Sequence, residues 1–288
     1  MKIPLSILKQ YFLPQRLLSR FIGKVAHSKL ALIKTPFIHY FHKHYHVNMQ
    51  EALEPSLSAY PSFCDFFIRK LKPEARPVDA HLHHLVSPAD GVISELGNIE
   101  STKLIQAKGV YFDLNNLFGQ QSSIATAFTN GKFITIYLAP KDYHRVHMPL
   151  AGHLREMIYV PGKLFSVNTT STQHIPQLFA RNERVISIFE TEAGPMALVL
   201  VGAMIVASIN TRWAGQITPG AKRQISTHSY KNVFLQKGEE MGYFNLGSTV
   251  IVLFGDQSIA WESTLHVSSK LKMGEKIGIK GPSILLAH

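Results

Sequence analysis

One peptide bond near the C-terminal end can carry unusual chemistry. Gly247 and Ser248 stand directly before an apolar, β-branched run at 250–254. Glycine leaves its carbonyl open to attack by the hydroxyl of the next residue, so this bond is either an ordinary turn or a scissile bond. The second interpretation requires a base and an acid elsewhere in the chain.

Two histidines supply candidates for proton transfer. His144 and His147 follow an apolar run at 133–138. As metal ligands they lack a further partner, because the chain has no Cys pair and no His-Glu-x-x-His motif, and we expect no metal. As a general base, one imidazole needs a carboxylate to orient it. They can also be structural histidines with local hydrogen bonds.

Asp90 offers such a carboxylate. It precedes Gly91 and the apolar pair at 92–93. Asp-Gly is most often only a turn, so this residue gains weight only together with the histidines.

The elements that must position these residues are predicted to be mostly strands. The runs at 133–138 and 185–190 alternate, 250–254 is a further apolar strand and 277–279 a short last one, and turn residues separate them. The uncharged stretch 195–209 is too short for a membrane helix and is expected to form buried strands around a turn. A helix is expected at 62–69, capped by Ser62. The pattern predicts an α+β fold with a mostly β body and a helical N-terminal layer.

The positive charge of the chain is concentrated at its N-terminus. The formal net charge is +11, and the first fifty residues hold eight Lys or Arg and no Asp or Glu. The remainder holds twenty-two basic and nineteen acidic residues. This distribution argues against nucleic-acid binding, which needs a basic face on the folded body, and favours an arm that meets an anionic surface.

The same arm is predicted to form amphipathic helices. Its apolar residues recur at helical spacing with basic residues between them, and Pro14 can start a helix. They include Leu17, Leu18, Phe21, Ile22 and Val25. No uncharged apolar stretch reaches eighteen residues, which argues against a membrane-spanning helix. The arm is either an interfacial anchor on anionic lipid or a helical layer on the protein's own core.

Two other classes of protein are compatible with single motifs. A serine hydrolase would also use Ser248, His147 and Asp90, but the nucleophile elbow Gly-x-Ser-x-Gly is absent around Ser248. A basic adaptor for lipid or nucleic acid would use the Gly-Ser pair only as a turn. The adaptor predicts an intact chain of 32.3 kDa.

Taken together, the motifs resemble those of the bacterial phosphatidylserine decarboxylases, which are pyruvoyl enzymes. The resemblance rests on Leu-Gly-Ser-Thr at 246–249, Tyr-His-Arg-Val-His-Met-Pro at 143–149 and Pro-Ala-Asp-Gly at 88–91. Segments 161–168 and 65–69 also match, and order and spacing agree across nearly the whole chain. The resemblance implies paired β-rich halves with helices at the membrane end. It also implies a carboxy-lyase that converts phosphatidylserine to phosphatidylethanolamine and CO2.

The resemblance further implies that the precursor cuts itself. The Ser248 hydroxyl attacks the Gly247 carbonyl and converts the amide to an ester. Loss of the serine α-proton then releases the upstream carboxylate and leaves dehydroalanine, whose hydrolysis releases ammonia and leaves a pyruvoyl group at position 248. The products are a large chain, 1–247, and a small chain, 248–288. This covalent cofactor forms a Schiff base with the substrate amine and takes up electrons as CO2 leaves.

Individual roles follow from the same resemblance. His147 is the base that activates Ser248, with Asp90 fixing its tautomer. His144 assists decarboxylation or reprotonation. Phe165 and Ser166 line the pocket for the headgroup.

The resemblance also implies an organisation and a set of partners. Residues 1–60 form a membrane-docking segment and residues 61–288 the catalytic domain. The partners are phosphatidylserine in an anionic membrane, the two chains of one precursor and a second copy in a homodimer, with no nucleic acid. The enzyme is expected to be peripheral, on the cytoplasmic face of the bacterial cell membrane.

Overall fold

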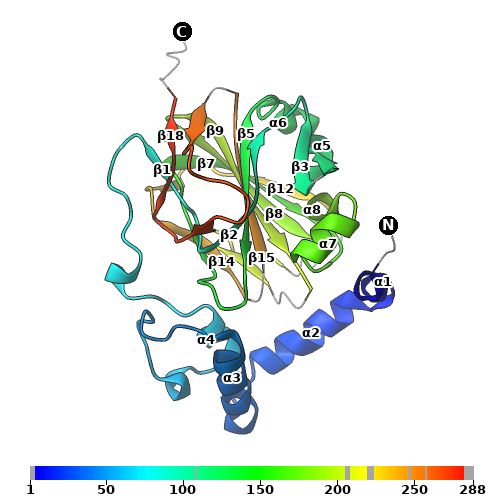
Figure 1. Cartoon of the computed structure of the whole chain (residues 1–288), viewed down its shortest axis with the longest axis vertical. Coiled ribbons are helices and arrows are strands. Elements are labelled where there is room, and N and C mark those ends of the chain that lie inside the picture. Colours follow the sequence, from blue (N-terminus) through cyan, green and yellow to red (C-terminus); the bar gives the residue numbers. More distant parts are fainter. Residues whose placement is uncertain are drawn as a thin grey trace.

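A large antiparallel sheet forms the centre of the protein (Figure 1). The computed structural model describes residues 4–281 except 108, 205–207, 219–223, 246–247 and 257, and only the backbone of Arg16 and Ser248. Within these residues the sheet has nine strands in the order β12-β7-β8-β9-β15-β5-β2-β17, with β13 paired to β7. The strands are β2 (Gly91–Asn98), β5 (Lys132–Leu138), β7 (Gly152–Val160), β8 (Arg184–Thr191), β9 (Gly194–Gly202), β12 (Ser226–Ser229), β13 (Phe234–Leu235), β15 (Ser248–Phe254) and β17 (Lys270–Leu271).

Three smaller antiparallel sheets accompany it. In the described residues, one has the order β11-β10-β14-β6, a second has the order β1-β18-β16, and β3 pairs with β4. Their strands are β1 (His84–Val86), β3 (Lys103–Ala107), β4 (Val110–Asp113), β6 (Arg145–His147), β10 (Ile209–Thr211), β11 (Gly215–Gln216), β14 (Glu240–Phe244), β16 (Ile259–Trp261) and β18 (Lys276–Lys280).

The large sheet separates two hydrophobic cores, and β15 contributes to both. Val250, Val252 and Phe254 belong to one core, whereas Ile251 and Leu253 belong to the other. Successive side chains of a strand point to opposite faces, so a strand between two cores reads as a continuous apolar run. This arrangement explains the uninterrupted apolar sequence after Ser248.

Short helices cover the second core. They are α5 (Leu114–Leu117), α6 (Ser122–Thr126), α7 (Thr169–His174) and α8 (Leu178–Arg181). Single 3₁₀ turns occur earlier in the chain, at η1 (Leu57–Ala59) and η2 (Pro73–Ala75).

The N-terminal helices lie along one side of this body (Figure 1). They are α1 (Leu5–Phe12), α2 (Gln15–Ala26), α3 (Ala31–Tyr45) and α4 (Phe63–Phe67). Pro14 precedes α2, and the Ser62 side chain accepts a hydrogen bond from the backbone of Asp65 at the start of α4, as expected. A third core joins α3 and α4 through Ile38, Phe41 and Phe63.

Helices α1 and α2 turn polar residues inward beside the buried Ile7 and Ala26, and leave several of their large apolar residues exposed. Gln10, Gln15 and Ser19 are buried, whereas Phe12 is 81% exposed and Phe21 is 66% exposed. A helix that packs on its own core normally shows the opposite distribution.

Within the described residues, no helix has both the length and the apolar character needed to cross a membrane.

The α+β prediction is confirmed, and the predicted strands are present. The runs at 133–138, 185–190, 250–254 and 277–279 lie within β5, β8, β15 and β18. The stretch 195–209 contains most of β9 and the first residue of β10, with residues 205–207 outside the described part.

Candidate active site

Ser248 is the first residue of a central strand. In the ladder of the large sheet it pairs with Leu138 at the end of β5 and with Gly202 at the end of β9. Gly247 lies outside the described residues. The backbone of Ser248 is therefore paired on both sides. It lies where the start of β15 meets the ends of β5 and β9.

His147 lies on β6 and is held in one tautomer. Its Nδ1 donates a hydrogen bond to the carbonyl of Gly238 at 2.8 Å, because a carbonyl can only accept. Its Nε2 lies 3.4 Å from the hydroxyl of Tyr143. Burial lowers the pKa of His147 from its ordinary value, so the ring is neutral near pH 7 with its lone pair on Nε2.

Asp90 makes a different set of contacts from those expected. Its carboxylate accepts a hydrogen bond from Nε of Arg76 at 2.8 Å and another from the backbone of Met273 at 2.9 Å. Within the described part of the chain, no hydrogen bond joins Asp90 to His147, and Gly238 fixes the histidine tautomer instead. The expectation that Asp90 fixes the tautomer of His147 is therefore wrong for a direct contact. Burial has the largest effect on the His147 pKa and lowers it, whereas the Gly238 hydrogen bond, the charge of Glu240 and, least of these, the charge of Asp90 raise it.

A polar cavity of about 180 Å³ adjoins Asp90. Tyr143, whose hydroxyl reaches His147, also lines it, together with Arg69 and Arg76. Burial raises the pKa of Tyr143, so its hydroxyl remains a donor. Asp90 and His147 are thus linked through neighbouring groups of one cavity wall.

His144 is fully buried beside the end of β14. Its Nδ1 donates to the carbonyl of Asp142 at 2.8 Å, and its ring centroid lies 4.1 Å from that of Phe67. Among the described residues its Nε2 has no hydrogen-bond partner. Burial lowers the pKa of His144 to about 3. Its carbonyl accepts from the backbone of Phe244, four residues before Ser248.

Phe165 and Ser166 are anchored close to the end of β9. The Asn182 amide donates to the carbonyl of Phe165 at 2.8 Å and to that of Gly202 at 2.9 Å. Since Gly202 pairs with Ser248, Asn182 connects the two parts of the site. The backbone of Ser166 is held by the side chain of Gln10 at 2.9 Å.

Several of these positioning residues were not singled out from the sequence. The sequence indicated Tyr143 only through its place in the histidine motif at 143–149. Arg76, Gly238 and Asn182 gave no signal, because their partners are distant in the chain.

Across the described residues, no group of three or more His, Cys, Asp or Glu side chains is arranged to hold a metal ion.

The chain belongs to the phosphatidylserine decarboxylase family. The family model with that description matches residues 63–279, and a second model, described as PSD, matches residues 5–46.

Three relatives illustrate how far the likeness extends. Proteins named phosphatidylserine decarboxylase proenzyme from Pseudomonas putida, Ectopseudomonas mendocina and Pseudomonas fluorescens are 53%, 52% and 51% identical to this chain. Their alignments cover 97%, 96% and 98% of this chain and 99% of each relative. The similarity therefore includes the N-terminal helices as well as the body.

Proposed function

We propose that this protein converts phosphatidylserine to phosphatidylethanolamine and CO2 through a Schiff base with a pyruvoyl group that it generates from its own Ser248. Membership of the decarboxylase family supports the reaction, and the word proenzyme in the names of the relatives supports self-processing. The observation that carries the proposal is the position of Ser248. It begins a buried strand, and the preceding strand β14 is hydrogen-bonded to the histidine segment.

The proposed cut lies between Gly247 and Ser248 and leaves chains 1–247 and 248–288. The small chain would begin with β15, which is paired on both sides by β5 and β9 of the large chain. Its apolar side chains are buried in two cores, so separation would expose most of them to water. The two products are therefore expected to remain associated.

In this proposal His147 is the base that removes the proton from the Ser248 hydroxyl. Gly238 fixes the tautomer with the lone pair on Nε2, where the Tyr143 hydroxyl is the hydrogen-bond partner, and burial keeps the ring neutral, so that the ring can accept a proton at Nε2 as a general base must. Asp90 contributes its charge and holds Arg76 at the wall of the same cavity.

The proposed role of His144 is to assist turnover. The pyruvoyl group supplies an electron sink for the charge left when CO2 departs. The neutral ring of His144 presents Nε2 as a base in a buried environment, so it must take up a proton before it can return one to the substrate carbon.

The proposed location is the cytoplasmic face of the bacterial cell membrane, with peripheral docking through residues 1–60. The outward apolar residues of α1 and α2 and the basic residues among them support this docking. The homodimer and the boundary at residue 60 stay predictions from the family resemblance.

Intact-protein mass spectrometry tests the self-processing. Wild-type protein should separate into two chains under denaturing conditions, and the small one should carry a pyruvoyl group in place of an N-terminal amine. Ser248→Ala and His147→Ala should remain single chains. His228→Ala is the matched control, because this histidine is exposed on β12 and should process fully.

An intact wild-type chain would contradict the proposal. If that chain also reacted with a fluorophosphonate probe at Ser248, the site would instead be that of a serine hydrolase. Full processing of His147→Ala would remove His147 from the role of base.

A further inference from the structure

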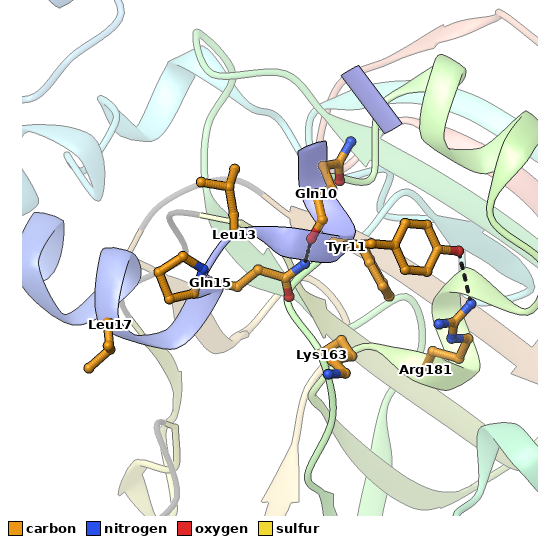
Figure 2. A pocket seen from close by; sticks show the side chains of 9 residues that line it. Gln10, Tyr11, Leu13, Gln15, Leu17, Lys163 and Arg181 are labelled. Carbon is orange, nitrogen blue, oxygen red and sulfur yellow. Dashed lines mark hydrogen bonds between the residues drawn. The ribbon is translucent and has the colours of Figure 1, made fainter. Parts of the chain in front are cut away.

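A cavity of about 410 Å³ lies between the N-terminal helices and the segment that holds Lys163 (Figure 2). Tyr11, Leu13 and Leu17 of the helical region form one wall, and Lys163 and Arg181 form the other. The cavity therefore brings two cations together with apolar side chains from the proposed docking segment.

The two cations are not neutralised by a carboxylate. No Asp or Glu lines the cavity, and neither Lys163 nor Arg181 forms an ion pair with any residue in the described ranges. Lys163 is exposed and Arg181 is half-buried. Two cations without a carboxylate partner in a concave site attract an anion.

Arg181 is held in place by aromatic neighbours. The guanidinium lies 4.9 Å from the ring centroid of Phe165. Nη1 donates to the hydroxyl of Tyr11 at 3.3 Å (Figure 2). The guanidinium has five N–H donors, and within the described residues this is its only hydrogen bond. The remaining donors suit a phosphate, which arginine binds in bidentate fashion.

The cavity opens toward exposed apolar surface. Leu13 also lines a groove of about 300 Å³ on α1, together with Leu5, Leu8, Phe12 and one basic residue, Lys9. Anion-binding groups beside an apolar groove match a phospholipid, whose phosphodiester is linked to acyl chains.

The cavity is connected to the proposed reacting residue through hydrogen bonds. Phe165 lines it, and Asn182 bonds both the carbonyl of Phe165 and that of Gly202, the β9 partner of Ser248. One wall of the cavity is therefore joined to the strand end at which Ser248 lies.

We propose that Lys163 and Arg181 bind the phosphodiester of the phospholipid substrate, and that the apolar residues beside them receive its glycerol and acyl part. The proposal rests on the proposed function and adds the recognition of the phosphate to it. The occupant is a membrane phospholipid, not free phosphate.

Kinetics with a short-chain phosphatidylserine below its micelle concentration test this site without a membrane surface. Lys163→Gln and Arg181→Gln should each raise KM roughly tenfold or more, as expected for loss of a hydrogen bond between charged groups, with kcat within about a factor of two. Arg181→Lys should recover part of the loss. The single variants Lys132→Gln and Arg155→Gln are the controls, because each removes one positive charge toward the other end of the sheet.

Binding measured in the uncut Ser248→Ala chain separates this proposal from the proposed function. Calorimetry with the same short-chain lipid should give a dissociation constant roughly tenfold higher when Arg181→Gln is added. This measurement requires neither processing nor turnover, so it can succeed even if the pyruvoyl chemistry fails.

Three results would overturn the proposal. KM values for Lys163→Gln and Arg181→Gln equal to those of the controls would show that these residues do not bind the substrate. A loss seen only on anionic vesicles would assign the two cations to general membrane attraction. Inhibition by inorganic phosphate that disappears in the variants, with unchanged lipid kinetics, would assign the cavity to a free anion.

Discussion

His144 and His147 reach the same state through separate contacts. Each imidazole donates from Nδ1 to a backbone carbonyl, that of Asp142 in one case and that of Gly238 in the other. Burial lowers both pKa values, so both rings are neutral near pH 7 and present a lone pair on Nε2. Both imidazoles can therefore accept a proton at Nε2, which is what the proposed base for self-processing must do.

Gly238 is the residue whose substitution tests the tautomer argument. Its φ of 77° favours glycine, and an added Cβ would lie 2.8 Å from Cγ2 of Val78. Gly238→Ala should displace the carbonyl from His147 and slow self-processing about tenfold or more, since a positioned base contributes about 10²–10⁴ in rate. The time course of the small chain after cell-free synthesis measures this.

Gly215→Ala is the matched control for backbone strain. Gly215 also has a positive φ, of 66°, but an added Cβ meets nothing within 4 Å. Both variants pay about 1–2 kcal/mol for the left-handed conformation. Equal processing rates in the two would show that the Gly238 carbonyl does not position the base.

The low pKa of His144 predicts a pH dependence of stability. Its folded pKa, about 3, lies below the unfolded value near 6.5, so the unfolded chain binds more protons between these values. Stability therefore falls as pH falls through this window. At pH 5 the loss from this residue is about 2 kcal/mol.

His144→Asn should reduce this dependence, because the amide can still donate to Asp142 but does not titrate. Denaturant midpoints at pH 7 and pH 5 should differ less in His144→Asn than in wild type, while His228→Asn should behave as wild type. An unchanged difference in His144→Asn would show that the buried ring is not the titrating group. Self-processing should be retained in His144→Asn, with turnover strongly reduced.

At the scale of elements, α4 connects the helical layer to the histidine segment. Its residues Phe63 and Phe66 belong to the third core with Phe41 of α3. Its last residue, Phe67, packs on His144. Just beyond it, the carbonyl of Ile68 accepts from Nε of Arg145 at 2.9 Å. A change in the helical layer can therefore reach the position of His144.

Phe67→Leu tests this connection. The smaller side chain keeps the site apolar but loses the ring contact with His144, so we expect kcat to fall about tenfold and stability to fall by about 1–3 kcal/mol. Phe112→Leu is the control, because Phe112 is equally buried in the second core. If both variants lost the same stability and the same kcat, the effect would be general destabilisation.

At the scale of the whole molecule, charge and apolar surface gather on the same segment. The first fifty residues carry eight basic and no acidic residues, and α1 and α2 expose large apolar side chains. These helices lie along one side of the body and border the cavity with Lys163 and Arg181 (Figures 1 and 2). A surface built in this way can hold the cavity against a bilayer.

The double variant Phe12→Ser/Phe21→Ser tests membrane docking. Burying each phenylalanine is worth roughly 1.5 kcal/mol or more, so binding to vesicles that contain phosphatidylserine should weaken on the order of a hundredfold. Cosedimentation measures the binding. Because Phe12 also lines the groove proposed for the acyl part of the substrate, turnover of the short-chain substrate is compared in Phe21→Ser alone, where it should change little. Leu82→Ser is the control, since Leu82 is 79% exposed but lies outside the helical segment. Equal weakening in the control would contradict docking through α1 and α2.

Much of the fold and part of the site follow from local sequence. Alternating runs predicted β5 and β8, and short apolar, β-branched runs predicted β15 and β18, because these patterns are properties of adjacent residues. The cap at Ser62 was predictable for the same reason. His144, His147 and Ser248 stood out by residue type and by motif order, which suffices to suggest a reaction.

The partners of these residues were decided only by tertiary structure. Gly238 is 91 residues from His147, and Arg76 takes the place beside Asp90 that a direct histidine contact was expected to fill. The inward direction of Gln10 and Gln15 likewise depends on the backbone of residues 164–166, which they bond. A hydrogen bond depends on which groups packing brings within about 3 Å, and periodicity along the chain carries no record of that distance.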